Sequence, residues 1–128
     1  MANLLVLVLD DLGKCPAILE AWEQAGVPGV TVCDSVGTRR LRERVQRDDV
    51  PLMPSLRSLF ASDEDHNRTL FAVIEDEAVL ARAVEVAQNI VGDFMQPHTG
   101  ILFVVPVARM WGVLKAERTS KPRVGEKR

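Results

Sequence analysis

A short apolar run near the carboxyl end of the chain strongly constrains its fold. Residues 100–107 read Gly-Ile-Leu-Phe-Val-Val-Pro-Val, which is rich in β-branched side chains and is bounded by a glycine and a proline. A run of this length and composition predicts a strand that is apolar on both faces, rather than a helix. Residues 4–9, 30–33 and 69–74 have the same character. The four runs together predict one sheet.

Two segments between these runs have the periodicity of amphipathic helices. The apolar positions of the first segment, which ends at Gly26, are Ile18, Leu19, Trp22 and Ala25. Those of the second segment, which begins after Asp76 and ends at Gly92, are Val79, Leu80, Ala83, Val86, Ala87 and Ile90. The order strand, helix, strand, strand, helix, strand predicts an α+β fold. We expect a ferredoxin-like βαββαβ sandwich, with an antiparallel four-stranded sheet and two helices on one face.

The length of the chain is that of a single domain. A chain of 128 residues with 47% apolar content can build one hydrophobic core. We assign residues 1–115 to this domain, with a long charged insertion at 37–68 between the second and third strands. A connection of that length without a regular period is usually functional. Residues 116–128 are charged and contain proline and glycine, which predicts a disordered tail.

Charge and cysteine usage narrow the functional classes. The net charge is −2, so no basic excess indicates a nucleic acid or an anionic membrane as a partner. The first apolar run ends at Asp10 and Asp11, which makes it too short for a signal peptide or a membrane span. Two cysteines without CxxC spacing fit a reducing compartment and argue against a zinc site. We expect a soluble, cytoplasmic protein.

The predicted sheet has more apolar surface than its two helices can cover. Residues 4–9 and 101–105 are apolar at every position, yet both helices lie on one face. A monomer would therefore expose a sheet-sized apolar surface to water. We expect copies of the chain to cover it in a closed oligomer. The alternative is that the 37–68 insertion folds back over this face.

Three stretches carry a resemblance to a known family. Residues 25–32 read Ala-Gly-Val-Pro-Gly-Val-Thr-Val, residues 36–40 read Val-Gly-Thr-Arg-Arg, and residues 100–107 form the last strand. With the order of elements, they make the chain similar to the PII signalling proteins, the nitrogen-regulatory trimers, over about residues 4–114. The resemblance implies a homotrimer with inward-facing sheets. It also implies a mobile loop at 37–68 that docks onto a transporter, channel or enzyme, and adenine nucleotides or 2-oxoglutarate bound in the clefts between subunits.

The resemblance implies a set of ligand-binding residues around the loop root and the last strand. Gly37 would let a nucleotide approach the backbone, and Arg40 would supply a planar fork for phosphate. The full set is Gly37, Thr38, Arg40, His98, Thr99, Gly100, Arg109 and Lys115.

The chain departs from the family where phosphate would bind. Residues 94–100, which match the phosphate-binding loop, contain one glycine and no lysine. The paired arginines that the family has after the last strand are replaced by Gly112 and Leu114, which leaves Arg109 and Lys115 nearby. These losses argue against tight triphosphate binding and leave AMP, ADP, a cyclic nucleotide or another small anion open.

We predict a non-enzymatic regulatory module without a metal site. An effector would order the loop root and so change how an apolar patch in the insertion is presented to a protein target. That patch consists of Leu52, Met53, Leu56, Leu59 and Phe60. Two alternatives stay open: a ferredoxin-like enzyme with an interface site built from Asp10, His98 and Arg109, and a metal-binding trimer like the copper-tolerance proteins.

Overall fold

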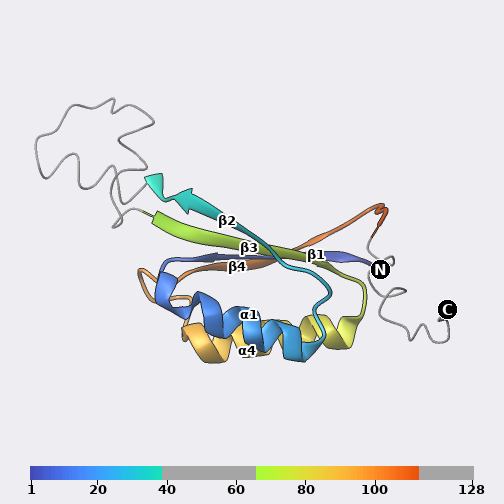
Figure 1. The fold of residues 1–128 in the computed structure, drawn as a ribbon, viewed down its shortest axis with the longest axis horizontal. Helices are drawn as coiled ribbons and strands as arrows, with labels where there is room; N and C mark the ends of the chain where they lie inside the picture. The colour runs from blue at the N-terminus through green and yellow to red at the C-terminus, as the bar shows by residue number, and fades with distance from the viewer. Residues whose placement is uncertain (39–65, 113–128) are drawn as a thin grey trace, which may run out of the picture.

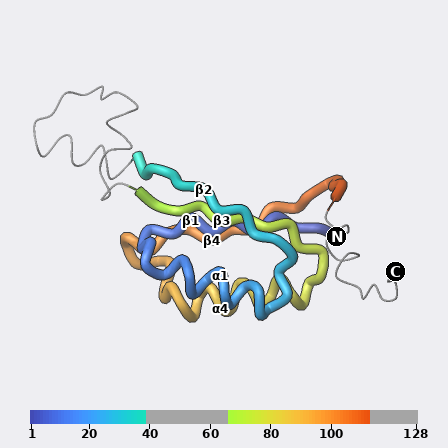
Figure 2. Tube along the Cα trace, viewed as in Figure 1, coloured from blue at the N-terminus to red at the C-terminus, as the bar shows by residue number. Residues whose placement is uncertain are grey.

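The computed structural model describes residues 1–38 and 66–112. Within these ranges the elements are β1 (Asn3–Leu9), a 3-10 turn η1 (Leu12–Lys14), α1 (Cys15–Ala25), β2 (Thr31–Val36), β3 (His66–Ile74), α4 (Glu77–Val91) and β4 (Gly100–Pro106). The strands form one antiparallel sheet in the order β2-β3-β1-β4. Both helices lie side by side against one face of this sheet (Figures 1 and 2). The predicted ferredoxin-like fold is therefore confirmed.

The second and third strands extend further toward the insertion than the sequence predicted. The predicted second strand, residues 30–33, lies at Thr31–Val36, and the third begins at His66 rather than at residue 69. Residues 66–68, which we had assigned to the insertion, are strand residues because their backbone pairs with residues 34–36. Most of the predicted insertion and the predicted tail at 116–128 lie outside the described residues.

The core lies between the sheet and the helices. Alternate residues of β1 and β3 point toward the helices and are buried: Leu5, Leu7, Leu9, Leu70, Ala72 and Ile74. Trp22 of α1 is fully buried among them, and its indole Nε1 donates a hydrogen bond of 3.0 Å to the carbonyl oxygen of Ala83 on α4. Because Ala83 and Ala87 are small, α4 can approach Trp22 closely, and the indole joins the two helices.

The opposite face of the sheet, which we call the open face, is also apolar. Its apolar side chains, assigned by strand alternation and register, are Leu4, Val6, Val8, Phe71, Val73, Ile101, Phe103 and Val105. Val6 is only 9% exposed because Phe71 and Phe103 flank it in register, whereas Ile101 is 54% and Phe103 is 41% exposed. The open face thus presents a contiguous apolar surface opposite the helices.

Candidate functional site

The candidate site is the end of the sheet from which the β2–β3 connection leaves. β1 ends at Leu9, which pairs with Arg68, whereas the β2–β3 pairing continues to Val36 and His66. The two strands therefore project beyond β1 by two residues, about 7 Å at the usual strand rise. The first residues of α1 and of β4 lie at this same end (Figure 1).

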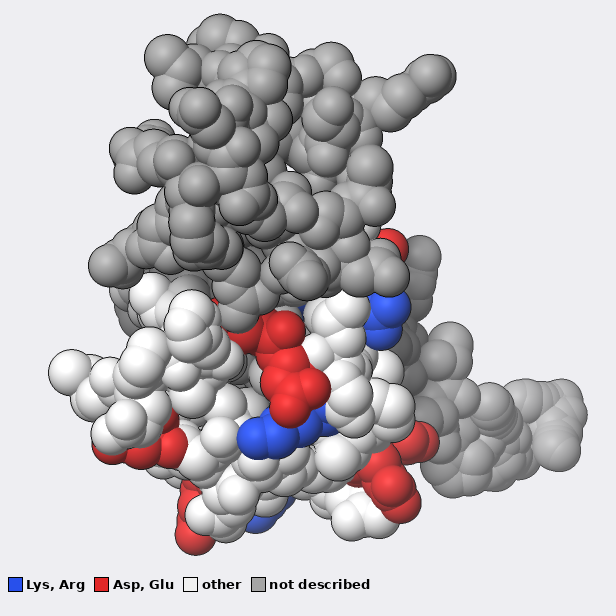
Figure 3. Space-filling view, turned by 90° about the vertical axis from the view of Figure 1, so that its left-hand side faces the viewer, with Lys and Arg blue, Asp and Glu red and all other residues white. Residues whose placement is uncertain are grey.

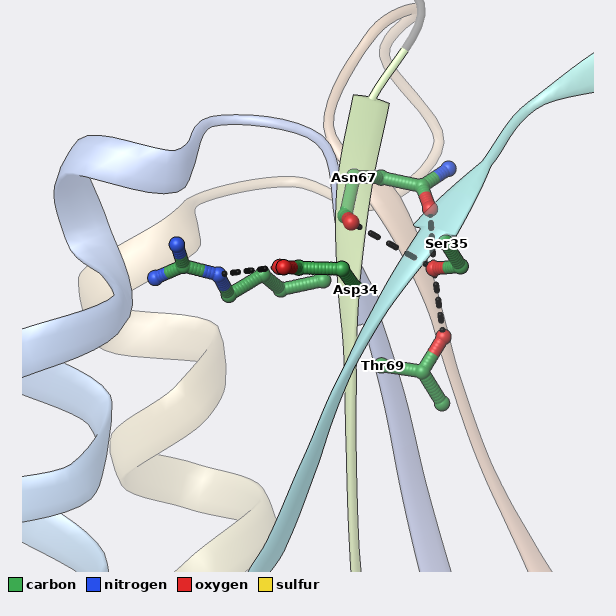
Figure 4. A network of polar contacts seen from close by, with 5 residues as sticks. Asp34, Ser35, Asn67 and Thr69 are labelled. Atoms are coloured by element: carbon green, nitrogen blue, oxygen red, sulfur yellow. Dashed lines mark hydrogen bonds and ion pairs between the residues drawn. The ribbon is translucent and has the colours of Figure 1, made fainter. Parts of the chain in front are cut away.

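On the open-face side of this end, a hydroxyl links the two projecting strands. The Ser35 hydroxyl donates a short hydrogen bond to the side-chain oxygen of Asn67, and it lies 3.0 Å from the Thr69 hydroxyl (Figure 4). A Cβ on Gly37 would lie 3.4 Å from the Asn67 amide nitrogen, so the glycine leaves the backbone beside this amide uncovered. The result is an uncharged group of donors and acceptors beside Gly37.

On the helix side of the same end, Asp34 and Arg68 form an ion pair. They face each other across β2 and β3, and the Arg68 Nε donates to the Asp34 carboxylate at 3.0 Å (Figure 4). This hydrogen bond, with a smaller contribution from Cys15, raises the pKa of Arg68 above its ordinary value. Because the arginine is already charged at every physiological pH, the pair acts as a cross-strand contact rather than as a titrating switch.

The loop before β4 is held by its own side chains. The Thr99 hydroxyl donates to the carbonyl oxygen of Gln96 at 2.8 Å, and the Asp93 carboxylate accepts from the backbone nitrogen of Met95 at 2.9 Å. His98 is exposed and has a positive φ of 65°. Thr99, predicted as a ligand residue, therefore uses its only hydroxyl proton to shape the loop, and as a ligand group it offers an acceptor.

Gly100 is required for close packing of the backbone. Its φ is +123°, and a Cβ at this position would lie 2.0 Å from the carbonyl oxygen of Val8. Only a glycine fits such an approach between β4 and β1. A side chain at this position would point at the backbone of β1, so packing of the two strands requires glycine here whether or not a ligand binds.

The predicted ligand residues that lie within the described ranges fall into three separate places. Gly37 and Thr38 follow β2 at one edge of the sheet, and His98 lies just before β4 at the other edge. The two edge strands are three strand spacings apart, or about 14 Å. Arg109 follows Pro106, which pairs with Asn3 at the far end of β1, about 20 Å from the start of β4 along the strand. One chain therefore does not bring these residues together.

The remaining predicted site residues lie outside the described residues. They are Arg40, Lys115 and the loop residues Leu52, Met53, Leu56, Leu59 and Phe60. The alternative enzyme site is divided within one chain, because Asp10 and His98 lie at the end where β4 begins and Arg109 lies at the other.

Sequence reasoning missed the group formed by Ser35, Asn67 and Thr69. The available signal was the spacing of two between Asn67 and Thr69, which places both side chains on one face of a strand. We did not use this signal because we had assigned residues 66–68 to the insertion, and side chains alternate between two faces only within a strand.

Neither a metal centre nor a membrane span is found within residues 1–38 and 66–112. These residues contain no group of three or more His, Cys, Asp or Glu side chains that could hold a metal ion. No helix among them is long and apolar enough to cross a membrane. Cys15 is buried and Cys33 is exposed, and both are free thiols.

The surface at this end carries both signs of charge. Figure 3 looks onto it and shows acidic side chains against basic ones in the middle of the described surface, with further acidic side chains toward its rim. The described part of this surface therefore forms no continuous basic patch. Any strong attraction for a polyphosphate would have to come from cations elsewhere, such as Arg40.

The Ser35 network leads to a stability prediction. Ser35→Ala should lower the free energy of unfolding by about 1 kcal/mol, because it removes a hydroxyl that bridges Asn67 and Thr69. Urea denaturation of Ser35→Ala, Thr69→Val and the double variant would measure this loss. The two losses should be less than additive, and strictly additive losses would show that the two hydroxyls do not interact.

Comparison with known proteins shows the fold and no more. No protein-family model matches the chain, and no curated protein matches it. Among 144 matching chains of solved structures is the crystal structure of a functionally unknown protein from Pediococcus pentosaceus ATCC 25745. That protein is 14% identical, with a TM-score of 0.54 over 87% of this chain and 96% of its own. At this identity the likeness concerns the architecture, which by itself does not determine function.

Proposed function

We propose that this chain is a PII-like regulatory protein without enzymatic activity. It assembles as a homo-oligomer, a trimer, and binds a small effector in the clefts between copies. It reports that binding to a protein target, a transporter or an enzyme, through the 37–68 insertion. We place it in the cytoplasm, in keeping with its two free cysteines.

The observation that carries this proposal is the apolar open face. Soluble monomers seldom expose contiguous apolar patches larger than about 300–600 Å². Here Leu4, Val6, Phe71 and Phe103 lie in adjacent positions of three neighbouring strands, and the helices occupy the other side. Association of identical chains through this face removes the surface from water and creates clefts along the sheet edges.

The end from which the insertion leaves supports an effector site there. Ser35 and Asn67 place hydrogen-bonding groups beside the bare backbone of Gly37, on strands that the sheet holds in register. Such a group suits the polar edge of a nucleobase or a sugar rather than a polyphosphate. AMP, ADP and cyclic nucleotides are therefore our first candidates, with Arg40 as the cation for a single phosphate.

Signalling requires more than binding. An effector shifts the insertion between two states only as far as its affinity for those states differs. An effector bound against Gly37 and Thr38 contacts the first residues of the insertion. Its free energy of binding can therefore depend on the conformation of the rest of the insertion. The apolar residues from Leu52 to Phe60 would then be presented differently to the target.

Limited proteolysis with added ligands tests this function. We expect a protease to cut the free protein within residues 39–65, and we expect the correct effector to slow this cleavage several-fold while leaving cleavage after residue 115 unchanged. AMP, ADP, ATP, cyclic nucleotides, 2-oxoglutarate and bicarbonate form the panel, and a thermal-shift scan of the same panel measures binding separately. A ligand that raises Tm without changing cleavage would contradict signalling through the insertion.

A further inference from the structure

We infer that the basic carboxyl-terminal residues 113–128 dock onto the acidic outer surface of the helix layer of their own chain. This surface lies on the side of the sheet opposite the open face. The inference therefore depends neither on the effector nor on the oligomeric state in the proposed function.

Two parts of the chain carry opposite charge. Residues 1–38 and 66–112 contain ten Asp or Glu side chains and four Lys or Arg side chains, whereas residues 113–128 contain two Glu and six Lys or Arg side chains. The net charge of −2 for the whole chain conceals this division. Opposite charges within one chain attract each other, most strongly at low ionic strength.

The acidic part of this division is concentrated on the helix layer. Six exposed carboxylates lie on the outside of the two helices or at the end where α4 begins: Glu20, Glu23, Glu75, Asp76, Glu77 and Glu85. Within residues 1–38 and 66–112 none of the six forms an ion pair. We call these six residues the acidic helix surface.

The cations of the helix layer are engaged with the backbone instead. The Arg82 guanidinium of α4 donates to the carbonyl oxygen of Ala25 at 2.9 Å, and the Lys14 ammonium group before α1 donates to that of Val91 at 3.4 Å. Each cation thus caps the carboxyl end of the other helix, and neither helix has a basic residue in its own last turn. The acidic helix surface is therefore left for cations from another segment.

The basic segment begins at the same end of the sheet as α4. Pro106 at the end of β4 pairs with Asn3, and Asn3 pairs with Ile74 at the end of β3, so these two strand ends are two strand spacings or about 10 Å apart. Asn3 also donates to the Glu77 carboxylate at 3.3 Å. The chain therefore continues to Gly112 from the end of the sheet where α4 begins (Figure 1).

The basic segment is long enough to cover the helix layer. Residues 113–128 in extended conformation span about 50 Å. The 15 residues of α4 form a helix about 22 Å long. Attachment at one end gives the cations an effective concentration on the order of millimolar near the carboxylates. Several weak surface ion pairs need no fixed backbone conformation, so docking is compatible with a composition that predicts disorder.

Carbodiimide cross-linking tests the docking, because this reagent forms an amide bond between a lysine and a carboxylate that touch. Three of the four lysines of the chain lie in the basic segment: Lys115, Lys121 and Lys127. At low ionic strength, mass spectrometry should find these lysines joined mainly to the acidic helix surface. In about 1 M NaCl, where the Debye length is about 3 Å, the yield should fall several-fold.

Two variants make this result specific. A triple variant, Glu20→Gln with Glu23→Gln and Glu85→Gln, should lower the yield of these cross-links at the remaining carboxylates several-fold, because it removes charge from exposed positions without touching the core. Asp10→Asn is the matched control, since Asp10 follows β1 at the opposite end of the sheet and should not affect the yield. Equal cross-linking to Asp10 and to the acidic helix surface, or a yield that neither salt nor the triple variant lowers, would overturn the inference.

Isotope labelling distinguishes docking within one chain from docking on a neighbouring copy. Equal amounts of ¹⁵N-labelled and unlabelled protein are mixed in urea, refolded together and cross-linked. We expect both peptides of each cross-linked pair to be labelled or both to be unlabelled. Pairs that join a labelled to an unlabelled peptide would contradict docking on the same chain. Neither result depends on an effector or on the open face, so this inference and the proposed function can fail separately.

Discussion

Gly100→Ala is expected to lower the free energy of unfolding by about 3 kcal/mol or more. The added methyl group would lie 2.0 Å from the Val8 carbonyl oxygen, and the φ of +123° is unfavourable for any residue with a Cβ. Relief requires β4 to move away from β1, which would disturb the pairing of a central strand. Urea denaturation followed by circular dichroism would measure the loss. It is a large part of the free energy of unfolding of a whole domain, which is typically about 5–15 kcal/mol.

Gly29→Ala is the matched control for this substitution. Nothing lies within 4 Å of a Cβ built at Gly29, and its φ is not in the positive range. Alanine there should change the free energy of unfolding by no more than about 1 kcal/mol, because it only reduces the conformational entropy of the unfolded chain. Equal losses in the two variants would mean that the close approach of Gly100 to Val8 does not exist in solution.

Phe103→Lys is expected to convert the oligomer into folded monomers. Phe103 lies in the middle of β4 on the open face, beside Val6, and it is not part of the core between the sheet and the helices. A lysine at an interface between copies would bury a charge without a partner, at a cost of several kcal/mol for each copy, roughly a thousandfold or more in the association constant. Sedimentation velocity should therefore shift from a multiple of the chain mass to 14.2 kDa, with the circular dichroism spectrum preserved.

Met95→Lys is the control for added charge. Met95 is 88% exposed in the loop before β4 and lies off the open face, so its replacement should leave the assembly intact. A wild-type protein that sediments as a monomer, or a Phe103→Lys variant that remains an oligomer, would show that the open face is not the surface through which copies associate. The apolar surface would then need another cover, and the 37–68 insertion would be the first alternative.

The predictions from sequence were accurate where the signal is local. The apolar stripe after Asp76 correctly predicted α4 up to its last turn, and the apolar run from Gly100 correctly predicted where β4 begins. Both patterns are local, because the spacing of side chains that share one face of a helix or strand follows from the backbone geometry of that segment alone. The predicted second and third strands were too short, because they left out residues 34–36 and 66–68. All of these residues except Val36 are polar, so they continue no apolar run, and their strand conformation comes from pairing with each other across the insertion.

The candidate site was less predictable than the fold. A family resemblance could name Gly37, His98 and Arg109, but it could not say that one chain places them at an edge, at the opposite edge and at the far end of the sheet. The group around Ser35 was missed altogether, since Ser35 is 32 and 34 residues away from Asn67 and Thr69 in sequence and meets them only through strand register.

The amino-acid sequence by itself determined the order of helices and strands, the stripe on each helix and the apolar character of both sheet faces, since these follow from the spacing of side chains within single segments. Only the tertiary structure decided that Ser35 meets Asn67, that Gly100 packs against Val8 and that Arg109 lies far from the other predicted ligand residues. The physical reason is that strand order and register are set by contacts between distant segments, which no local pattern of side chains encodes.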